Sequence, residues 1–175
     1  NKKDIYNFKR KNKIKLMEKN KILCAKFRKG HFEGVIDIMD RLTRLIKPKK
    51  IFMGEKDYQQ YLLVKKFLEE KYRVKIIKCN TVRLANNVAL SSRNKRDLLI
   101  AGEIINELIN FKKILKKLKT VKNLLQYKKK DLIKKYKIKI EYLEIRNIKD
   151  LKKSNKIKNS KIFIAYYLNN TRLID

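Results

Sequence analysis

IFMGEKDYQQ, residues 51–60, is a short apolar run that stops at a glycine and continues into charged and polar residues. The pattern predicts a strand that leads directly into a helix. In an open α/β sheet, ligands bind beyond the carboxyl ends of the strands, where the next helix offers free backbone N–H groups to an anion. Gly54 would let such a ligand approach the backbone closely.

A purely structural interpretation of the same residues is also open. Asp57 is followed three positions later by Gln60, a spacing similar to the capping box, in which two side chains satisfy free N–H groups at a helix start. The residues alone do not decide between capping and ligand binding.

The flanking residues extend the pattern into a βαβ unit. A helical repeat of apolar residues begins at Phe32 and ends before Pro48, which cannot continue a helix. Residues 57–71 predict a second helix, and residues 74–79 predict a second strand. Strand, helix and strand at this spacing imply a parallel sheet with a right-handed crossover. The Lys-rich residues 1–29 predict one or two strands or a loose arm.

The second half of the chain predicts a small α+β domain. Residues 81–94 show no period and are expected to form a loop that contains the domain boundary. The elements expected after it are helices at 97–118 and 121–136, a strand at 138–145, a short helix near Leu151 and a final strand at 162–168.

The charge balance is unusual but does not indicate a reader of nucleic acid. The chain has 49 basic and 17 acidic residues, for a net charge of +32. Proteins that read nucleic acid favour Arg, whose planar fork pairs with phosphates and base edges, whereas here Lys predominates and is scattered through almost every segment. Specific nucleic-acid binding is therefore disfavoured, and weak adhesion at low salt is expected.

The compartment expected from the sequence is the cytoplasm. Cys24, Cys79 and His31 share no ligand spacing, so neither a zinc site nor a disulfide framework is indicated. No signal peptide is recognisable, and no apolar run approaches the ~18 residues of a membrane helix. Because the sequence begins with Asn1 rather than Met, we expect its natural start to be missing.

Two polar loops, residues 54–60 and 90–94, are the candidate ligand sites, and together they could line one cleft. Lys56 and Arg93 supply positive charge, hydroxyl and backbone donors lie at residues 91–92, and Asp57 can accept hydrogen bonds from ribose hydroxyls. This set suits a nucleoside triphosphate. The alternatives are that Ser91 and Ser92 cap the following helix and that Arg93 forms a surface ion pair.

Three motifs together resemble the pantoate–beta-alanine ligase family. They are RKGHFEGV at 28–35, GEKDYQQ at 54–60 and ALSSRN at 89–94, in the family's order and near its spacing. The ending TRLID, residues 171–175, is similar to the family's C-terminus. The resemblance covers most of the chain.

The resemblance implies a fold and a reaction. The fold is α/β, with the latter part of a Rossmann-like, nucleotidyltransferase-type parallel sheet in residues 1–85 and a small α+β C-terminal lid domain in residues 86–175. In the reaction, the carboxylate of pantoate attacks the α-phosphate of ATP to give pantoyl adenylate, and the amine of beta-alanine then displaces AMP. ATP is a substrate, Mg²⁺ accompanies it, and the intact family enzyme is commonly a homodimer.

The resemblance also implies roles for individual residues. Lys56 and Arg93 would stabilise charge on the phosphates during adenylation, and Gln60 would hydrogen-bond pantoate. The residues expected to bind ATP are Gly54, Glu55, Lys56, Asp57, Val82, Leu90, Ser91, Ser92 and Arg93, with Asp57 on the ribose and Val82 at the adenine edge. No metal ligands are implied.

Some family features are changed or absent. Lys29 replaces the proline of Arg-Pro-Gly-His-Phe, and residues 86–88, NNV, stand where Asp-Gly-Leu is usual. The upstream motif Thr-Met-Gly-Ala-Leu-His-x-Gly-His, with its catalytic histidine, cannot be present because the chain has a single histidine. We therefore expect the C-terminal part of the enzyme, with little or no ligase activity alone. The alternatives are an inactive or complementing subunit that needs a partner, and a basic nucleic-acid-binding protein.

Overall fold

The computed structural model describes residues 14–93, 97–118, 121 and 123–175. The chain divides into two compact units, an N-terminal unit of residues 1–80 and a C-terminal unit of residues 81–175. Each unit has its own sheet and its own apolar core, so each is described by itself.

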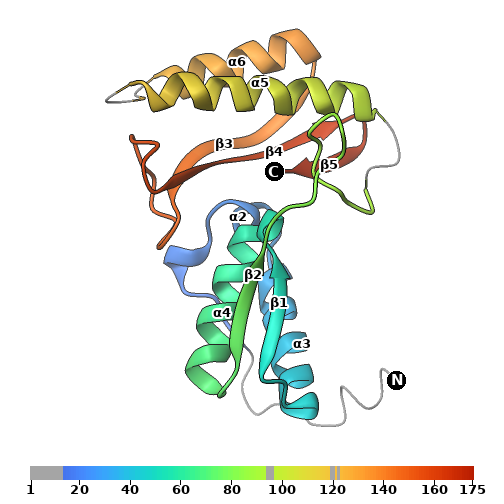
Figure 1. Ribbon diagram of the computed structural model, residues 1–175, viewed down its shortest axis with the longest axis vertical. Helices are drawn as coiled ribbons and strands as arrows, with labels where there is room; N and C mark the ends of the chain where they lie inside the picture. The colour runs from blue at the N-terminus through green and yellow to red at the C-terminus, as the bar shows by residue number, and fades with distance from the viewer. Residues whose placement is uncertain (1–13, 94–96, 119–120, 122) are drawn as a thin grey trace. The chain divides into compact units, whose positions relative to one another are not determined.

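The N-terminal unit contains the predicted βαβ arrangement (Figure 1). Strands β1 (Lys50–Gly54) and β2 (Lys75–Cys79) pair in parallel, and helix α4 (Tyr58–Lys71) connects them. Helices α3 (His31–Ile46) and α4 pack on one face of this sheet. The core that they share with the sheet consists of Val64, Leu68, Val74 and Ile76, with Val35, Met39, Ile51 and Met53 against it.

The start and end of α3 follow from local sequence. Gly30 precedes the helix at a φ of 75°, a left-handed conformation that glycine adopts without steric cost. At the other end Lys47 adopts a φ of 51°, and its N–H donates to the carbonyl of Thr43 at 2.8 Å. Pro48 follows at once and prevents a further turn.

The prediction for the beginning of the chain is wrong where it can be checked. Residues 1–13 lie outside the described residues, and residues 14–29 contain no strand but two short helices, η1 (Glu18–Asn20) and α2 (Cys24–Phe27). The buried side chain of Gln59 organises this segment. Its Nε2 donates to the carbonyls of Asn20 and Ile22 at 3.1 and 2.8 Å, contacts that local sequence patterns do not reveal.

The C-terminal unit is an antiparallel sheet with two helices on one face (Figure 1). Its strands are β3 (Lys139–Asn147), β4 (Ser160–Leu168) and β5 (Thr171–Ile174), hydrogen-bonded in that order. Helices α5 (Leu98–Lys116) and α6 (Leu124–Tyr136) supply the covering layer. The largest buried core cluster joins them to the sheet through Ala101, Ile104, Ile105, Leu108, Leu132, Ile140, Leu143, Ile164 and Tyr166.

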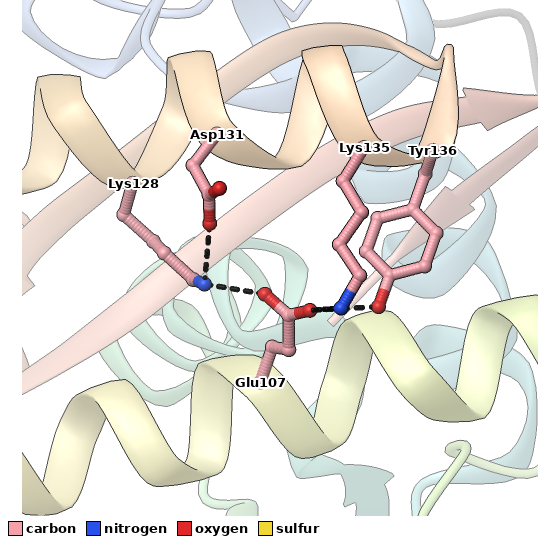
Figure 2. Close-up of polar contacts among 5 residues, drawn as sticks. All are labelled: Glu107, Lys128, Asp131, Lys135 and Tyr136. Atoms are coloured by element: carbon pink, nitrogen blue, oxygen red, sulfur yellow. Dashed lines mark hydrogen bonds and ion pairs between the residues drawn. The ribbon is translucent and has the colours of Figure 1, made fainter.

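A carboxylate network joins the two helices of this layer. Glu107 on α5 accepts hydrogen bonds from Lys128, Lys135 and Tyr136 on α6, the last at 2.8 Å (Figure 2). Lys128 also donates to Asp131 at 2.9 Å. Leu132 is the buried residue of α6 among those described, and Leu124, Leu125 and Tyr136 pack against the core. The polar contacts to Glu107 add to this apolar packing.

Two details of this unit differ from the sequence-based expectation. No helix forms near Leu151; the chain instead turns between β3 and β4, with Leu151 at a φ of 57° and its carbonyl accepting from Arg146 Nη1 at 2.6 Å. Strand β5 was not predicted, because it is only four residues long and follows β4 after a two-residue turn.

Among the residues that the structure describes, no helix has the length and apolar character needed to cross a membrane.

Candidate functional site

The residues expected to bind ligands divide between the two units. Gly54, Glu55, Lys56, Asp57 and Gln60 lie in the N-terminal unit, and Val82, Leu90, Ser91, Ser92 and Arg93 lie in the C-terminal unit. The geometry of each set is described within its own unit.

Gly54 ends β1 with an unobstructed approach to its backbone. Its φ of −67° and ψ of 135° are ordinary extended values, so the backbone conformation does not require glycine. A Cβ built on it would meet no atom within 4 Å. Neither strain nor packing within the described chain explains a glycine here, which fits a position left open for a ligand.

Asp57 is at the start of α4 without capping it. Residues Glu55–Asp57 form the 3₁₀ turn η2 between β1 and the helix, and Asp57 occupies the N-cap position. Its side chain is exposed and makes no capping hydrogen bond. The capping-box interpretation is therefore wrong for Asp57, and its side chain is exposed to solvent at the start of the helix.

Glu55 is held by a cation from the neighbouring strand. Lys78, near the end of β2, pairs with the Glu55 carboxylate, and its Nζ lies 6.0 Å from the centre of the Tyr58 ring. The hydrogen bond to Glu55 raises the pKa of Lys78. Burial raises the pKa of Tyr58, while the Lys78 charge opposes that rise. Lys78 was not among the predicted residues. Its position near the carboxyl end of the predicted strand 74–79 could have indicated it, because ligands bind beyond the carboxyl ends of parallel strands.

The two adjacent glutamines of α4 have different roles. Gln59 is buried, and besides its two donated hydrogen bonds its Oε1 accepts from the N–H of Ala25 at 3.4 Å. Gln59 is thus a structural residue that fastens the 20–25 segment to α4. Gln60 is only partly buried, which leaves it the more accessible of the two for a substrate.

The predicted loop at residues 81–94 contains a small hairpin. Leu90 N–H donates to the carbonyl of Val82, and Leu84 N–H to that of Val88, both at 2.9 Å. The hairpin places Val82 and Leu90 opposite each other and leaves their side chains 67% and 56% exposed. Two apolar side chains so exposed at one end of a hairpin could cover a flat apolar ligand such as a nucleobase.

Residues 86 and 87 show how the chain tolerates its departure from the family sequence. Asn87 at the hairpin tip has a φ of 69°, a conformation that Asn adopts more readily than other non-glycine residues. Asn86 Nδ2 donates to the carbonyl of Leu98 at 2.7 Å. A Cβ on Gly102 would lie 2.8 Å from this Nδ2, so α5 needs glycine there to admit the Asn86 side chain.

Ser91, Ser92 and Arg93 follow the hairpin and precede α5 without capping it. The helix begins at Leu98 after Asp97, so the interpretation of the serines as its N-cap is wrong. Ser91 Oγ instead accepts from the N–H of Arg93 at 3.3 Å. Arg93 Nη1 donates to the carbonyl of Arg172 at 3.2 Å; within the described residues its recorded partner is thus a carbonyl and not a carboxylate.

No ready-made metal centre accompanies these residues. Across the described ranges, no group of three His, Cys, Asp or Glu side chains could hold a metal ion. His31, at the first position of α3, packs at 5.0 Å between ring centres against Phe32.

Comparisons with known proteins agree on one family. The family model described as pantoate-beta-alanine ligase matches residues 1–175. The pantothenate synthetase of Buchnera aphidicola subsp. Acyrthosiphon pisum is 36% identical over 169 residues, which cover 93% of this chain and 59% of that protein. The bifunctional pantoate ligase/cytidylate kinase of Prochlorococcus marinus is 44% identical over 134 residues, covering 73% of this chain and 25% of that protein.

Solved structures agree with this result. The pantothenate synthetase of Thermus thermophilus superposes with a TM-score of 0.87 at 24% identity, covering 100% of this chain and 66% of that one. The pantoate-beta-alanine ligase of Francisella tularensis, solved with beta-gamma ATP and beta-alanine, gives a TM-score of 0.75 at 32% identity and covers 99% and 60%. The predicted α/β fold class is therefore confirmed. The chain spans about three fifths of the Buchnera protein and of the Francisella structure.

Proposed function

This chain belongs to the pantoate–beta-alanine ligase family, and we propose that it supplies nucleotide-binding and charge-stabilising residues for the AMP-forming condensation of pantoate with beta-alanine. The family match along all 175 residues carries the proposal. The Francisella relative solved with beta-gamma ATP and beta-alanine supports the choice of substrates.

The proposed reaction has two steps. A carboxylate oxygen of pantoate attacks the α-phosphorus of ATP, the bond to the bridging oxygen breaks, and pyrophosphate leaves. The amine of beta-alanine then attacks the acyl carbon of pantoyl adenylate, loses a proton and expels AMP. Because adenylation supplies the leaving group that a free carboxylate lacks, the protein's task is to position the reactants and to stabilise charge.

The N-terminal unit would bind ATP at the end of β1. The backbone of Gly54 is open to a ligand, and the exposed, uncapped Asp57 would accept hydrogen bonds from the ribose. Lys56 would offset negative charge on the phosphates, and the partly buried Gln60 would hydrogen-bond pantoate. The Glu55 carboxylate is already paired with Lys78, so we assign its ATP contact to the backbone.

The C-terminal unit would contribute the remaining contacts. The exposed Val82 would lie at the adenine edge, and the segment Leu90 to Arg93 would contact the phosphates. Arg93 suits this role because its described hydrogen bond to a carbonyl uses only one of five N–H donors. Magnesium, when bound with ATP, would neutralise part of the triphosphate charge, and no protein ligand for it is assigned.

A binding measurement tests these assignments. Mg-ATP is titrated into the chain, alone and mixed with the part of the Buchnera relative that this chain does not cover. Lys56→Ala and Arg93→Ala should each weaken ATP binding by about tenfold or more, since a hydrogen bond to a charged group contributes about 1.5–3 kcal/mol. Lys66→Ala, which removes an exposed lysine from α4, should change nothing. ATP affinity that is insensitive to both Lys56 and Arg93 would contradict the proposal.

A further inference from the structure

The loop proposed to carry the C-terminal ATP contacts is fastened at one end to Asp175, the residue after strand β5, and at the other end to β5 itself. At one end the guanidinium of Arg83 forms two parallel hydrogen bonds with the Asp175 carboxylate, Nη1 to Oδ2 at 2.6 Å and Nη2 to Oδ1 at 2.7 Å. At the other end Arg93 Nη1 reaches the carbonyl of Arg172. The segment 82–93 therefore lies along β5 and the residue that follows it.

Arg83 also holds the hairpin itself. Besides Asp175, its Nη1 donates to the carbonyl of Asn87 at 2.8 Å. One side chain thus connects the tip of the hairpin to Asp175, the residue that follows β5. The Arg83 and Asp175 side chains are 35% and 18% exposed, so water screens the pair only in part, and bidentate geometry is the strongest form of such a contact.

The structure to which the loop is fastened is itself firmly held. Arg172 donates through Nε and Nη2 to Oε2 of Glu141 on β3, at 2.9 and 2.6 Å, and both side chains are largely buried. Asp175 exchanges two backbone hydrogen bonds with Ile164 on β4, at 3.0 and 3.2 Å. Strand β5 and Asp175 are therefore joined to the rest of the sheet by several hydrogen bonds. The hairpin, in contrast, leaves the side chains of Val82 and Leu90 exposed.

We propose that Asp175, acting through Arg83, is a positioning residue that holds the 82–93 loop in the arrangement that binds ATP. The expected effect on ATP binding rests on the proposed function. The claim that Asp175 holds the 82–93 loop concerns the C-terminal unit alone and does not depend on that function. The apparent Kd of a ligand rises as the fraction of molecules in the binding arrangement falls. We call the Arg83–Asp175 pair the clamp. Its loss should therefore weaken ATP binding while the fold stays intact.

Hydrogen exchange of individual amides tests the clamp directly. In Asp175→Asn, exchange at the N–H groups of Leu84 and Leu90 should be about tenfold faster, as expected for loss of a charged hydrogen bond. Exchange at Ile104 in the core of α5 should be unchanged. Asp175→Glu, which keeps the carboxylate, should restore most of the protection. Asp150→Asn removes the charge from an exposed ion pair of the same unit and serves as the matched control.

Titration of Mg-ATP into the chain, alone and in the mixture, supplies the second measurement. Asp175→Asn should raise the Kd for ATP at least threefold, and Asp150→Asn should leave it unchanged. Unchanged exchange at Leu84 and Leu90 would overturn the clamp, and faster exchange with an unchanged Kd would overturn its role in binding. If the unsubstituted protein bound no ATP, either alone or in the mixture, the proposed function would fail, and the role of Asp175 in binding would fail with it. The exchange rates would still decide whether Asp175 holds the loop.

Discussion

Among individual residues, Gly54 is the clearest case of a glycine that the described fold does not require. Its conformation is open to any residue, and an added Cβ would meet nothing within 4 Å. In Gly102 the same addition would bring a Cβ to within 2.8 Å of Asn86 Nδ2. The first glycine is free of structural constraint within the described chain, and the second is required by packing.

We expect Gly54→Ala to fold normally and to bind ATP less well. The free energy of unfolding should stay equal or rise by up to about 1 kcal/mol, because alanine restricts the unfolded chain more than glycine does. The added methyl group should reduce ATP affinity by about tenfold if the nucleotide approaches this backbone. Urea unfolding followed by circular dichroism, together with the ATP titration, measures both quantities.

Two other glycines provide the controls for Gly54→Ala. Gly34→Ala, in the interior of α3 with open space around it, should stabilise the chain by about 0.5–1 kcal/mol and leave ATP binding unchanged. Gly102→Ala should destabilise it, because Asn86 cannot give way without losing its bond to Leu98. An unchanged ATP affinity in Gly54→Ala would show that the open space is not used by the nucleotide.

At the scale of elements, a single carboxylate of α5, that of Glu107, accepts hydrogen bonds from three side chains of α6. Burial alone would raise the pKa of Glu107, but hydrogen bonds from Lys128, Lys135 and Tyr136 lower it to about 2 from an ordinary value of 4.5 (Figure 2). A group whose pKa is depressed in the folded state stabilises the fold fully above its unfolded pKa. That stability is lost as the pH falls through the folded value.

Glu107 should therefore make the fold sensitive to acid between about pH 5 and pH 2. We expect Glu107→Gln to lower the free energy of unfolding at pH 6 by about 1–2 kcal/mol, a value reduced for partial exposure. Its stability should also change less between pH 6 and pH 3 than that of the unsubstituted chain. Urea unfolding at both pH values measures this, with exposed Glu103→Gln as the control. Equal acid sensitivity in both proteins would contradict the role of Glu107.

Elements with a clear apolar period were predictable from the sequence. The repeat that begins at Phe32 and the run 51–53 predicted α3 and β1, and α5 and α6 were predicted to within a few residues at most boundaries. One failure came where a distant contact decides the conformation, because the segment 14–29 is held by Gln59. The turn at Leu151 is held by Arg146, five residues earlier, through a hydrogen bond to a backbone carbonyl that an apolar period does not reveal.

At the scale of the whole molecule, the sequence indicated the candidate ligand-binding residues but not the side chains that hold them in place. The polar residues of 54–60 and 90–94 marked both segments, and the motif resemblance assigned roles to their residues. The Lys78 partner of Glu55 and the Arg83–Asp175 pair instead depend on side chains brought together by the fold. Several lysines, including Lys71, Lys78 and Lys128, form ion pairs within their own unit, which is a structural use of charge.

The most direct test of the proposed function is amide formation itself. AMP release is followed with pantoate, beta-alanine and Mg-ATP, using the chain alone and the chain mixed with the part of the Buchnera relative that it does not cover. We predict little or no AMP from the chain alone, and from the mixture AMP release that requires both substrates and falls at least about 100-fold in Lys56→Ala. A folded mixture that released no AMP, or release indifferent to Lys56→Ala, would contradict the account.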